Sequence, residues 1–122
     1  MKSVILVSRD PELMADVLDA CKARNIQVTV EANWSRAIDR SSTANLLIVD
    51  LLATLAIPHR ISGYVAFAEA KMRSTASKTP LVLVGAPVGY RLDGMAGWPG
   101  FLTAFFERPI TEEVLDALLD YA

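Results

Sequence analysis

Short apolar runs recur along the chain and alternate with longer segments in which apolar residues return every three or four positions. An apolar run of four to six residues between polar residues is typical of a strand buried on both faces. The segment 26–30 alternates apolar and polar residues instead, which is typical of a strand at the edge of a sheet. The pattern predicts five strands, at 3–7, 26–30, 45–50, 80–84 and 101–106.

The segments between and after these strands carry helical spacing, which predicts helices at 11–24, 33–42, 61–73 and 111–122. Asp10 and Thr111 are the expected N-caps, because their side-chain oxygens accept hydrogen bonds from backbone N–H groups of the first turn. Pro11 suits the first helical position because its φ is already fixed. The segment 85–100 contains five glycines and two prolines. These helix breakers predict that the fourth helix is short or irregular.

Strands that alternate with helices predict an α/β fold with an open parallel sheet and right-handed crossovers. A length of 122 residues suits one core, so a single domain over 1–122 is expected. In such sheets, functional groups lie beyond the carboxyl ends of the strands. The segments expected at those ends are 8–10, 50–52, 85–86 and 107–109.

Composition and charge exclude several classes of function. The chain is 52% hydrophobic and has a net charge of −2, and it lacks the clustered Lys and Arg that a nucleic-acid surface needs. No apolar run approaches the roughly 20 residues that span a bilayer, and no signal-peptide pattern is present. Cys21 and His59 are single residues of their types, so neither a disulfide nor a transition-metal site is expected. We expect a cytoplasmic protein with no nucleic-acid partner and no membrane contact.

Two charged residues stand at predicted strand ends. Asp50 closes an apolar strand, where its carboxylate either faces the crevice beyond the sheet or caps a neighbouring loop. Arg108 follows the last strand and precedes Pro109, which cannot continue a ladder of hydrogen bonds. The guanidinium of Arg108 either reaches across the strand ends toward Asp50 or remains a surface charge. Spacing alone leaves these alternatives open.

Four segments together resemble the receiver domain of two-component response regulators: "VILVSRDPEL" (4–13), "LLIVDLL" (46–52), "TPLVLVGA" (79–86) and "FFERPI" (105–110). The resemblance covers essentially the whole chain and is carried by the order and spacing of these segments. It implies a flavodoxin-like (CheY-like) three-layer sandwich with a five-stranded parallel sheet in the order 2-1-3-4-5. Asp50 then stands at the phospho-acceptor position. The other matched positions are the acidic pair (Ser8, Arg9), the switch positions (Gly85, Phe105) and the lysine position (Arg108).

The sequence departs from the family at most of these positions. The acidic pair of the family holds Mg²⁺, an ion that requires oxygen ligands and favours carboxylates. Ser8 offers only a neutral hydroxyl, and Arg9 repels a cation. The adjacent Asp10 either compensates for this loss or serves as the N-cap. No cofactor is therefore expected, and Mg²⁺ binding is disfavoured.

A permanent cation is the hypothesis that explains an arginine in this pocket. We predict that Arg9 or Arg108 pairs with Asp50 and holds one conformation. In the alternative, both guanidinium groups point into solvent and the pocket has no role.

The leading interpretation is a pseudo-receiver domain that signals through protein contacts without Mg²⁺-dependent phosphorylation and is not an enzyme. Its partner is expected to be a signalling protein or an output domain, with a homodimer through the fifth strand and last helix as a further expectation. The candidate interface comprises Trp98, Leu115 and Leu119, with one apolar stripe of the last helix left partly open. Two alternatives remain: a phosphorylatable receiver that uses Asp50 with a weakened metal site, and a small-ligand module of flavodoxin-like fold.

Overall fold

The computed structural model describes residues 2–50, 53, 79–85 and 104–122. The strands are β1 (Ser3–Val7), β2 (Gln27–Glu31), β3 (Leu46–Asp50), β4 (Leu81–Val84) and β5 (Ala104–Phe106). The helices are α1 (Pro11–Ala23), α2 (Trp34–Ser41) and α4 (Glu112–Leu119). The predicted helix at 61–73, the irregular segment after Gly85 and Trp98 lie outside the described residues.

The five strands form one parallel sheet in the order β2-β1-β3-β4-β5, so the predicted topology is confirmed. In the register of the sheet, Val7 lies opposite Val49 and Asp50 lies opposite Val84. The carboxyl ends of β1, β3 and β4 therefore meet at one edge, which brings the residues that follow them together.

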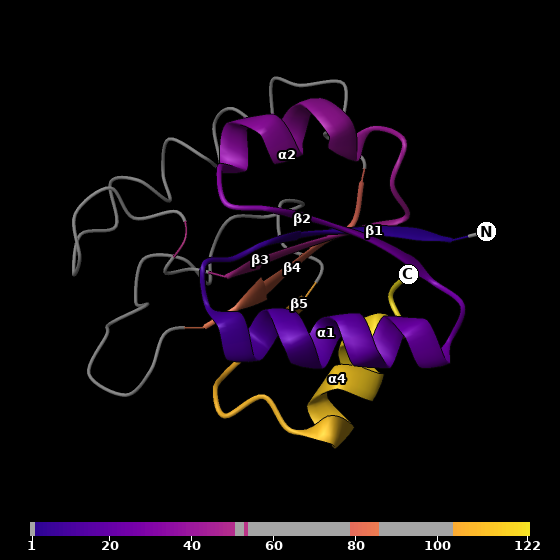
Figure 1. Cartoon of the computed structure of the whole chain (residues 1–122), viewed down its shortest axis with the longest axis vertical. Coiled ribbons are helices and arrows are strands. Elements are labelled where there is room, and N and C mark those ends of the chain that lie inside the picture. The colour runs from indigo at the N-terminus through magenta and orange to yellow at the C-terminus, as the bar shows by residue number, and fades with distance from the viewer. Residues whose placement is uncertain (1, 51–52, 54–78, 86–103) are drawn as a thin grey trace.

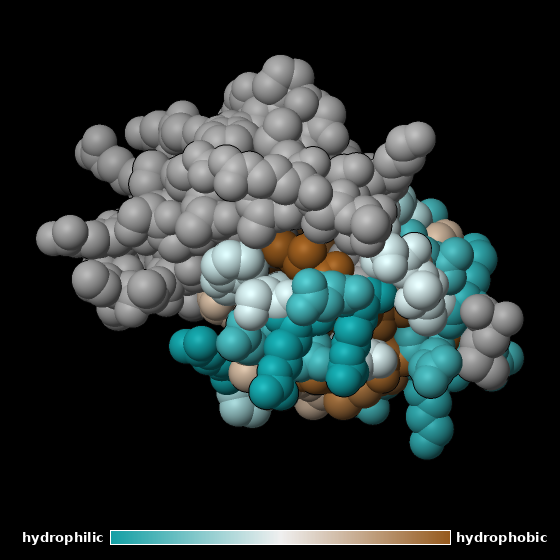
Figure 2. All heavy atoms as spheres, turned by 90° about the horizontal axis from the view of Figure 1, so that it is seen from above, coloured by the Kyte–Doolittle hydropathy of each residue, from teal (hydrophilic) through white to brown (hydrophobic). Residues whose placement is uncertain are grey.

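Three layers are visible in Figure 1, with α2 on one face of the sheet and α1 and α4 side by side on the other. Every residue of β3 and β4 is buried, because both strands are covered on both faces. The alternating segment forms β2, whose residues are exposed or only partly buried, as expected for an edge strand. Seen with α2 toward the viewer, the described surface is mostly hydrophilic (Figure 2).

Caps fix the ends of α1. The Asp10 carboxylate accepts a hydrogen bond from the N–H of Glu12 at 3.0 Å, so the expected N-cap is confirmed. At the other end, Asn25 has φ 57°, and the N–H of Ile26 donates to the carbonyl of Cys21 at 2.9 Å. This pattern is a Schellman motif, in which asparagine tolerates the left-handed conformation.

The side chain of Arg24 joins α1 to α4. Its guanidinium lies 3.1 Å from Asp116 Oδ1 and 3.1 Å from Asp120 Oδ1. The Thr111 side chain caps α4 as predicted, because its oxygen accepts from the N–H of Val114. The two helices are thus held together by ion pairs at the surface and by apolar side chains beneath.

The structure corrects the prediction for the apolar residues of the last helix. Leu115 and Leu119 are only 6% and 2% exposed and pack in the core with Leu118. They do not form an open stripe, because all three of these leucines of α4 pack in one core cluster with residues of α1 and the sheet. Tyr121 is the exposed apolar residue here, at 42%, and its ring meets Phe106 edge-on at 6.3 Å.

No helix within the described ranges is long and apolar enough to cross a membrane.

A matched pair of truncations tests the core. Leu118 is fully buried, whereas Leu18 on α1 is 45% exposed. Leu118→Ala is expected to lower the free energy of unfolding by about 2–5 kcal/mol, because it removes buried apolar contacts and leaves a cavity. Leu18→Ala should lower it by less than about 1 kcal/mol. Urea unfolding followed by circular dichroism measures both, and equal effects would contradict the assignment of Leu118 to the core.

Candidate functional site

Asp50 ends β3 at the centre of the sheet and is 1% exposed. Its neighbours on either side are β1 and β4, so its carboxylate lies where three strand ends converge. A carboxylate at this depth needs charged or hydrogen-bonding partners, because burial strongly disfavours an unpaired charge.

Arg108 supplies that partner. Its Nη1 donates to Asp50 Oδ1 at 3.2 Å and its Nη2 donates to Asp50 Oδ2 at 2.9 Å, so the ion pair is bidentate. The side chain of Arg108 is 15% exposed and that of Asp50 is 2% exposed. The planar guanidinium matches the geometry of a carboxylate, which a lysine ammonium does not. The predicted pairing of Arg108 with Asp50 is confirmed.

Two further acceptors surround the same guanidinium. The carbonyl of Gly85 accepts from Nη1, and Asp10 Oδ2 accepts from Nη2 at 3.2 Å. Arg108 thus contacts the ends of β3 and β4 and the first turn of α1. We call Arg108, Asp50, Asp10, Ser8 and Gly85 the arginine cluster.

Ser8, which directly follows β1, completes the cluster. Its side chain is buried, and its hydroxyl donates to Asp50 Oδ2 at 3.0 Å. The Ser8 Oγ also accepts a hydrogen bond from the N–H of Asp10 at 3.0 Å. The Ser8 hydroxyl is therefore engaged both as a donor and as an acceptor, and it ties the end of β1 to Asp50.

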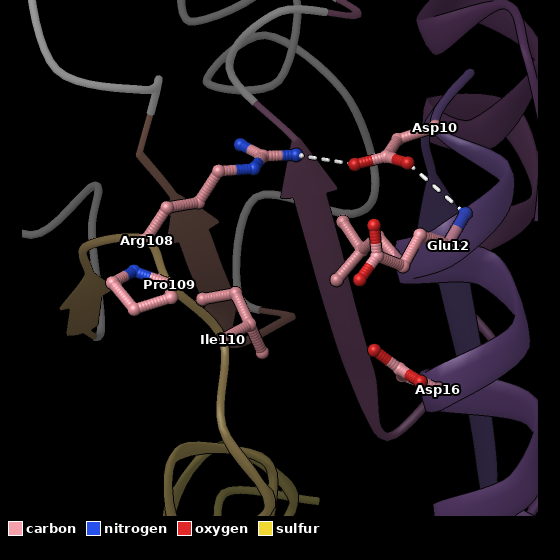
Figure 3. Close-up of a pocket in the computed structure, with 7 residues that line it drawn as sticks. Asp10, Glu12, Asp16, Arg108, Pro109 and Ile110 are labelled. Carbon is pink, nitrogen blue, oxygen red and sulfur yellow. Dashed lines mark hydrogen bonds and ion pairs between the residues drawn. The ribbon is translucent and has the colours of Figure 1, made fainter.

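Asp10 has two roles, since its Oδ1 caps α1 and its Oδ2 binds Arg108 (Figure 3). Burial raises the pKa of Asp10, but the hydrogen bond from Arg108 and the N–H groups of Leu13 and Glu12 outweigh it, and the pKa lies below its ordinary value. Burial likewise lowers the pKa of Arg108, but Asp50 and Asp10 outweigh it and raise that pKa. The ion pair between Asp10 and Arg108 is therefore charged at neutral pH.

Arg9 does not join the cluster. It is exposed, and among the described residues it forms no ion pair with Asp50. In an extended segment successive side chains point to opposite sides. Ser8 and Asp10 both face the cluster, so Arg9 between them faces away. The alternative in which Arg9 neutralises Asp50 is wrong, and so is the one in which both arginines point into solvent.

The structure places the backbone of both switch positions. Gly85 is buried, and its N–H donates to the carbonyl of Phe106 at 2.8 Å. Phe105 lies opposite Leu83 in the sheet. Their roles as switch residues stay predictions.

Oxygen donors for a metal ion are scarce at this site. In the part of the chain that the structure describes, no group of three or more His, Cys, Asp and Glu side chains is placed to hold a metal. The two carboxylates of the cluster both bind Arg108, and the Ser8 hydroxyl is already engaged. This donor set does not fit Mg²⁺, which requires near-octahedral oxygen ligands.

The sequence did not single out Gly85 as an acceptor for Arg108 or Asp10 as its second anion. A signal was present for Asp10, since an N-cap aspartate after a central strand carries a second carboxylate oxygen free to bind elsewhere. No signal marked the Gly85 carbonyl, because any residue type provides one.

No family model matches the sequence, and no curated protein matches it. Solved structures do match. The chemotaxis response regulator CheY4 of Vibrio cholerae is 18% identical with a TM-score of 0.73, over 100% of this chain and 99% of that one. The non-phosphorylated HemR receiver domain of Leptospira biflexa is 17% identical with a TM-score of 0.74, over 98% and 92%.

A third match is a structure from a family of redox sensors in the streptococci, described as evolved from two-component response regulators. It is 11% identical with a TM-score of 0.76, over 99% of this chain and 51% of that one. At these identities the likeness establishes the fold. The chain has the fold of response-regulator receiver domains, as the sequence predicted.

Removal of either partner tests the buried ion pair. Arg108→Met is expected to lower the free energy of unfolding by about 3 kcal/mol, because it leaves the Asp50 charge buried without its guanidinium. Asp50→Asn should also destabilise the chain, since Arg108 then loses its main counter-charge. The double variant should be more stable than the sum of the single effects predicts. Urea unfolding of all four proteins measures the coupling, and strictly additive effects would contradict the pair.

The lowered pKa of Asp10 gives a test by titration. Because the folded pKa lies below the unfolded one, Asp10 contributes stability above about pH 4, which is lost as the pH falls through the folded pKa. Arg108→Met should raise the folded pKa of Asp10, measured by NMR of its carboxyl carbon. A pKa that stays unchanged in this variant would show that Arg108 does not hold the carboxylate.

Proposed function

We propose that the chain is a pseudo-receiver domain, which acts through protein contacts without Mg²⁺-dependent phosphorylation of Asp50. The observation that carries this proposal is the bidentate, buried ion pair between Arg108 and Asp50. A phosphorelay-type signalling pathway, a cytoplasmic location and the absence of catalytic activity of its own are parts of the same proposal.

The ion pair opposes phosphorylation because it occupies the nucleophile. Both oxygens of Asp50 accept hydrogen bonds from Arg108, and Oδ2 also accepts from Ser8. These donors draw electron density from both oxygens and make each a weaker nucleophile. Any movement of Asp50 toward a phosphoryl group also disturbs a buried ion pair, which is costly to break.

The second support concerns the positive charge that phosphoryl transfer requires. Phosphoryl transfer requires a positive charge that neutralises the phosphoryl oxygens, and in receivers Mg²⁺ supplies it. Arg108 supplies a positive charge, but Asp50 and Asp10 already bind it. Together these three groups carry a net charge of −1, so the cluster offers no surplus positive charge to an incoming phosphoryl group.

A fixed conformation follows from the same contacts. The arginine cluster joins the ends of β1, β3 and β4 to the first turn of α1 through a side chain that follows β5. A receiver that switches needs two states of similar free energy. The ion pair favours one of them permanently, so the domain would present a constant surface to a signalling protein or an output domain.

The streptococcal redox sensors lend this proposal indirect support, since they are described as descendants of response regulators with a different task. A homodimer through β5 and the last helix remains an alternative assembly. On that face Tyr121 offers exposed apolar surface, whereas Leu115 and Leu119 do not.

Restoration of the missing chemistry tests the proposal. The intact chain should show neither Mg²⁺ binding nor labelling of Asp50 by acetyl phosphate. A variant with Ser8→Glu and Arg108→Lys should gain both, because it adds a carboxylate beside Asp50 and frees Asp50 from the guanidinium fork. Arg9→Asp alone is the matched control, and it should gain neither, because residue 9 faces away from the cluster and Arg108 still binds Asp50.

Isothermal titration with MgCl₂ and intact mass spectrometry after treatment with acetyl phosphate provide the measurements. Mass labelling of the unaltered chain that requires Mg²⁺ and disappears in Asp50→Asn would overturn the proposal. It would establish the alternative, a receiver with a weakened metal site.

A further inference from the structure

Two adjoining cavities lie between α1 and the segment that leads into α4. The first has a volume of about 340 Å³ and begins at Asp10 and Arg108 (Figure 3). The second has a volume of about 380 Å³ and continues along α1 as far as Arg24. Asp16 and Ile110 line both cavities, so we treat them as one surface, the α1–α4 groove.

Part of the lining of the α1–α4 groove is apolar and includes small side chains, and we call this apolar part its floor. Its apolar lining residues are Leu13, Ala20, Ala23, Pro109, Ile110 and Leu115. From Glu12 to Ala23, the residues of α1 that line the groove recur at spacings of three or four and share one face. At 1.5 Å per residue this face is about 16 Å long, the length of three helical turns. The length of this face therefore matches a helix of about three turns.

The walls of the groove are acidic. Six acidic and two basic side chains line the groove, which gives a formal charge of −4. The acidic residues are Asp10, Glu12, Asp16, Asp19, Glu112 and Asp116, and the basic residues are Arg24 and Arg108. The whole chain carries −2, so the rest of the molecule is positive by +2. The negative charge of the protein is concentrated on this one hollow surface.

Several of these carboxylates have no counter-charge within the described structure. Arg24 binds Asp116 and Asp120, and Arg108 binds Asp10 and Asp50. Glu12, Asp16 and Asp19 form no ion pair with another described residue, and neither does Glu112. In Figure 3, Glu12 and Asp16 project from α1 toward the side of Pro109 and Ile110. Among the described residues, four negative charges thus border an apolar floor without an ion-pair partner.

We propose that the α1–α4 groove binds a basic amphipathic helix of a partner protein. Leu and Ala on one face of that helix would pack on the apolar floor, and Lys or Arg on its flanks would meet the unpaired carboxylates. This inference rests on the proposed function, since it gives the chemistry of a partner for a domain that acts through protein contacts.

Charge argues against the other occupants. A second copy that docked groove to groove would bring two surfaces of −4 together, and like charges across an interface cost free energy. A nucleic acid would be repelled for the same reason. A cationic helix matches both the charge and the length of the groove.

The test uses the full chain and a designed helical peptide of about 14 residues, long enough for three turns and frayed ends. The peptide contains Leu and Ala on one face and Lys on the flanks. A scrambled peptide of the same composition is its control. Asp16→Asn with Asp19→Asn removes two charges from the groove, and Asp39→Asn with Glu113→Gln removes two charges elsewhere. Fluorescence anisotropy of the labelled peptides measures the dissociation constants.

The groove variant is expected to bind the peptide about fivefold to thirtyfold more weakly than the unaltered chain, on the scale of two partly exposed ion pairs. The outer variant should bind within about twofold, and salt should weaken binding to the unaltered chain. Ala23→Phe, which fills part of the floor without a change in charge, should also weaken it. Equal loss in both charge variants, or equal binding of the scrambled peptide, would overturn the proposal.

Two other results would assign the groove to a different occupant and also overturn it. One is self-association of the chain in sedimentation experiments that the groove variant abolishes. The other is displacement of the peptide by Ca²⁺ that is lost in the same variant.

The outcomes of the peptide experiments are independent of the chemistry of Asp50. If Asp50 is labelled but the peptide binds as expected, only the proposed function fails; if Asp50 is inert and the peptide does not bind, only the groove proposal fails.

Discussion

The ion pair between Arg108 and Asp50 is the interaction on which the rest of the site depends. It places a guanidinium among the carboxyl ends of the strands, where both charges are largely removed from water. A buried pair stabilises a fold only if the remaining donors and acceptors are also satisfied. Ser8, Asp10 and the Gly85 carbonyl meet that condition. The pair is therefore part of a network that spans three strands and the start of α1, and no member can change without consequences for the others.

A covalently attached cation differs physically from a bound metal ion. A metal ion exchanges with solvent, and its occupancy depends on concentration and on the charge of the site. Arg108 is present at a fixed stoichiometry, and its neighbours raise its pKa further. Asp50 thus has a counter-charge under all ordinary conditions. Under the proposed function, a permanent cation would give up the responsiveness to phosphorylation that a metal site provides and would gain a single, stable arrangement of the strand ends.

The sequence predicted the sheet well because burial on two faces leaves an unmistakable pattern. The strand at 3–7 was found at its predicted residues, and the alternating segment formed the edge strand one residue later than predicted. For the last helix, the same reasoning wrongly predicted a partly open apolar stripe. Leu115, Leu118 and Leu119 are all buried in the core with residues of α1 and the sheet. Which apolar stripe is covered depends on how closely a neighbouring helix packs, and periodicity does not encode that distance. Likewise, the sequence places two arginines at strand ends and does not say which one binds Asp50. The structure shows that Arg9 lies between Ser8 and Asp10, whose side chains face the cluster, so its own side chain points away.

Asp10 connects the ion-pair network with the α1–α4 groove, because it binds Arg108 and also lines the first cavity. A cation that approaches Asp10 from the groove competes with Arg108 for one carboxylate. It does not reach Asp50, whose bidentate contacts with Arg108 lie deeper. A partner in the groove would therefore weaken the contact of Arg108 with Asp10 and leave its contacts with Asp50 intact. In the proposed arrangement the arginine would hold the strand ends in place, and the acidic surface beside it would bind the partner.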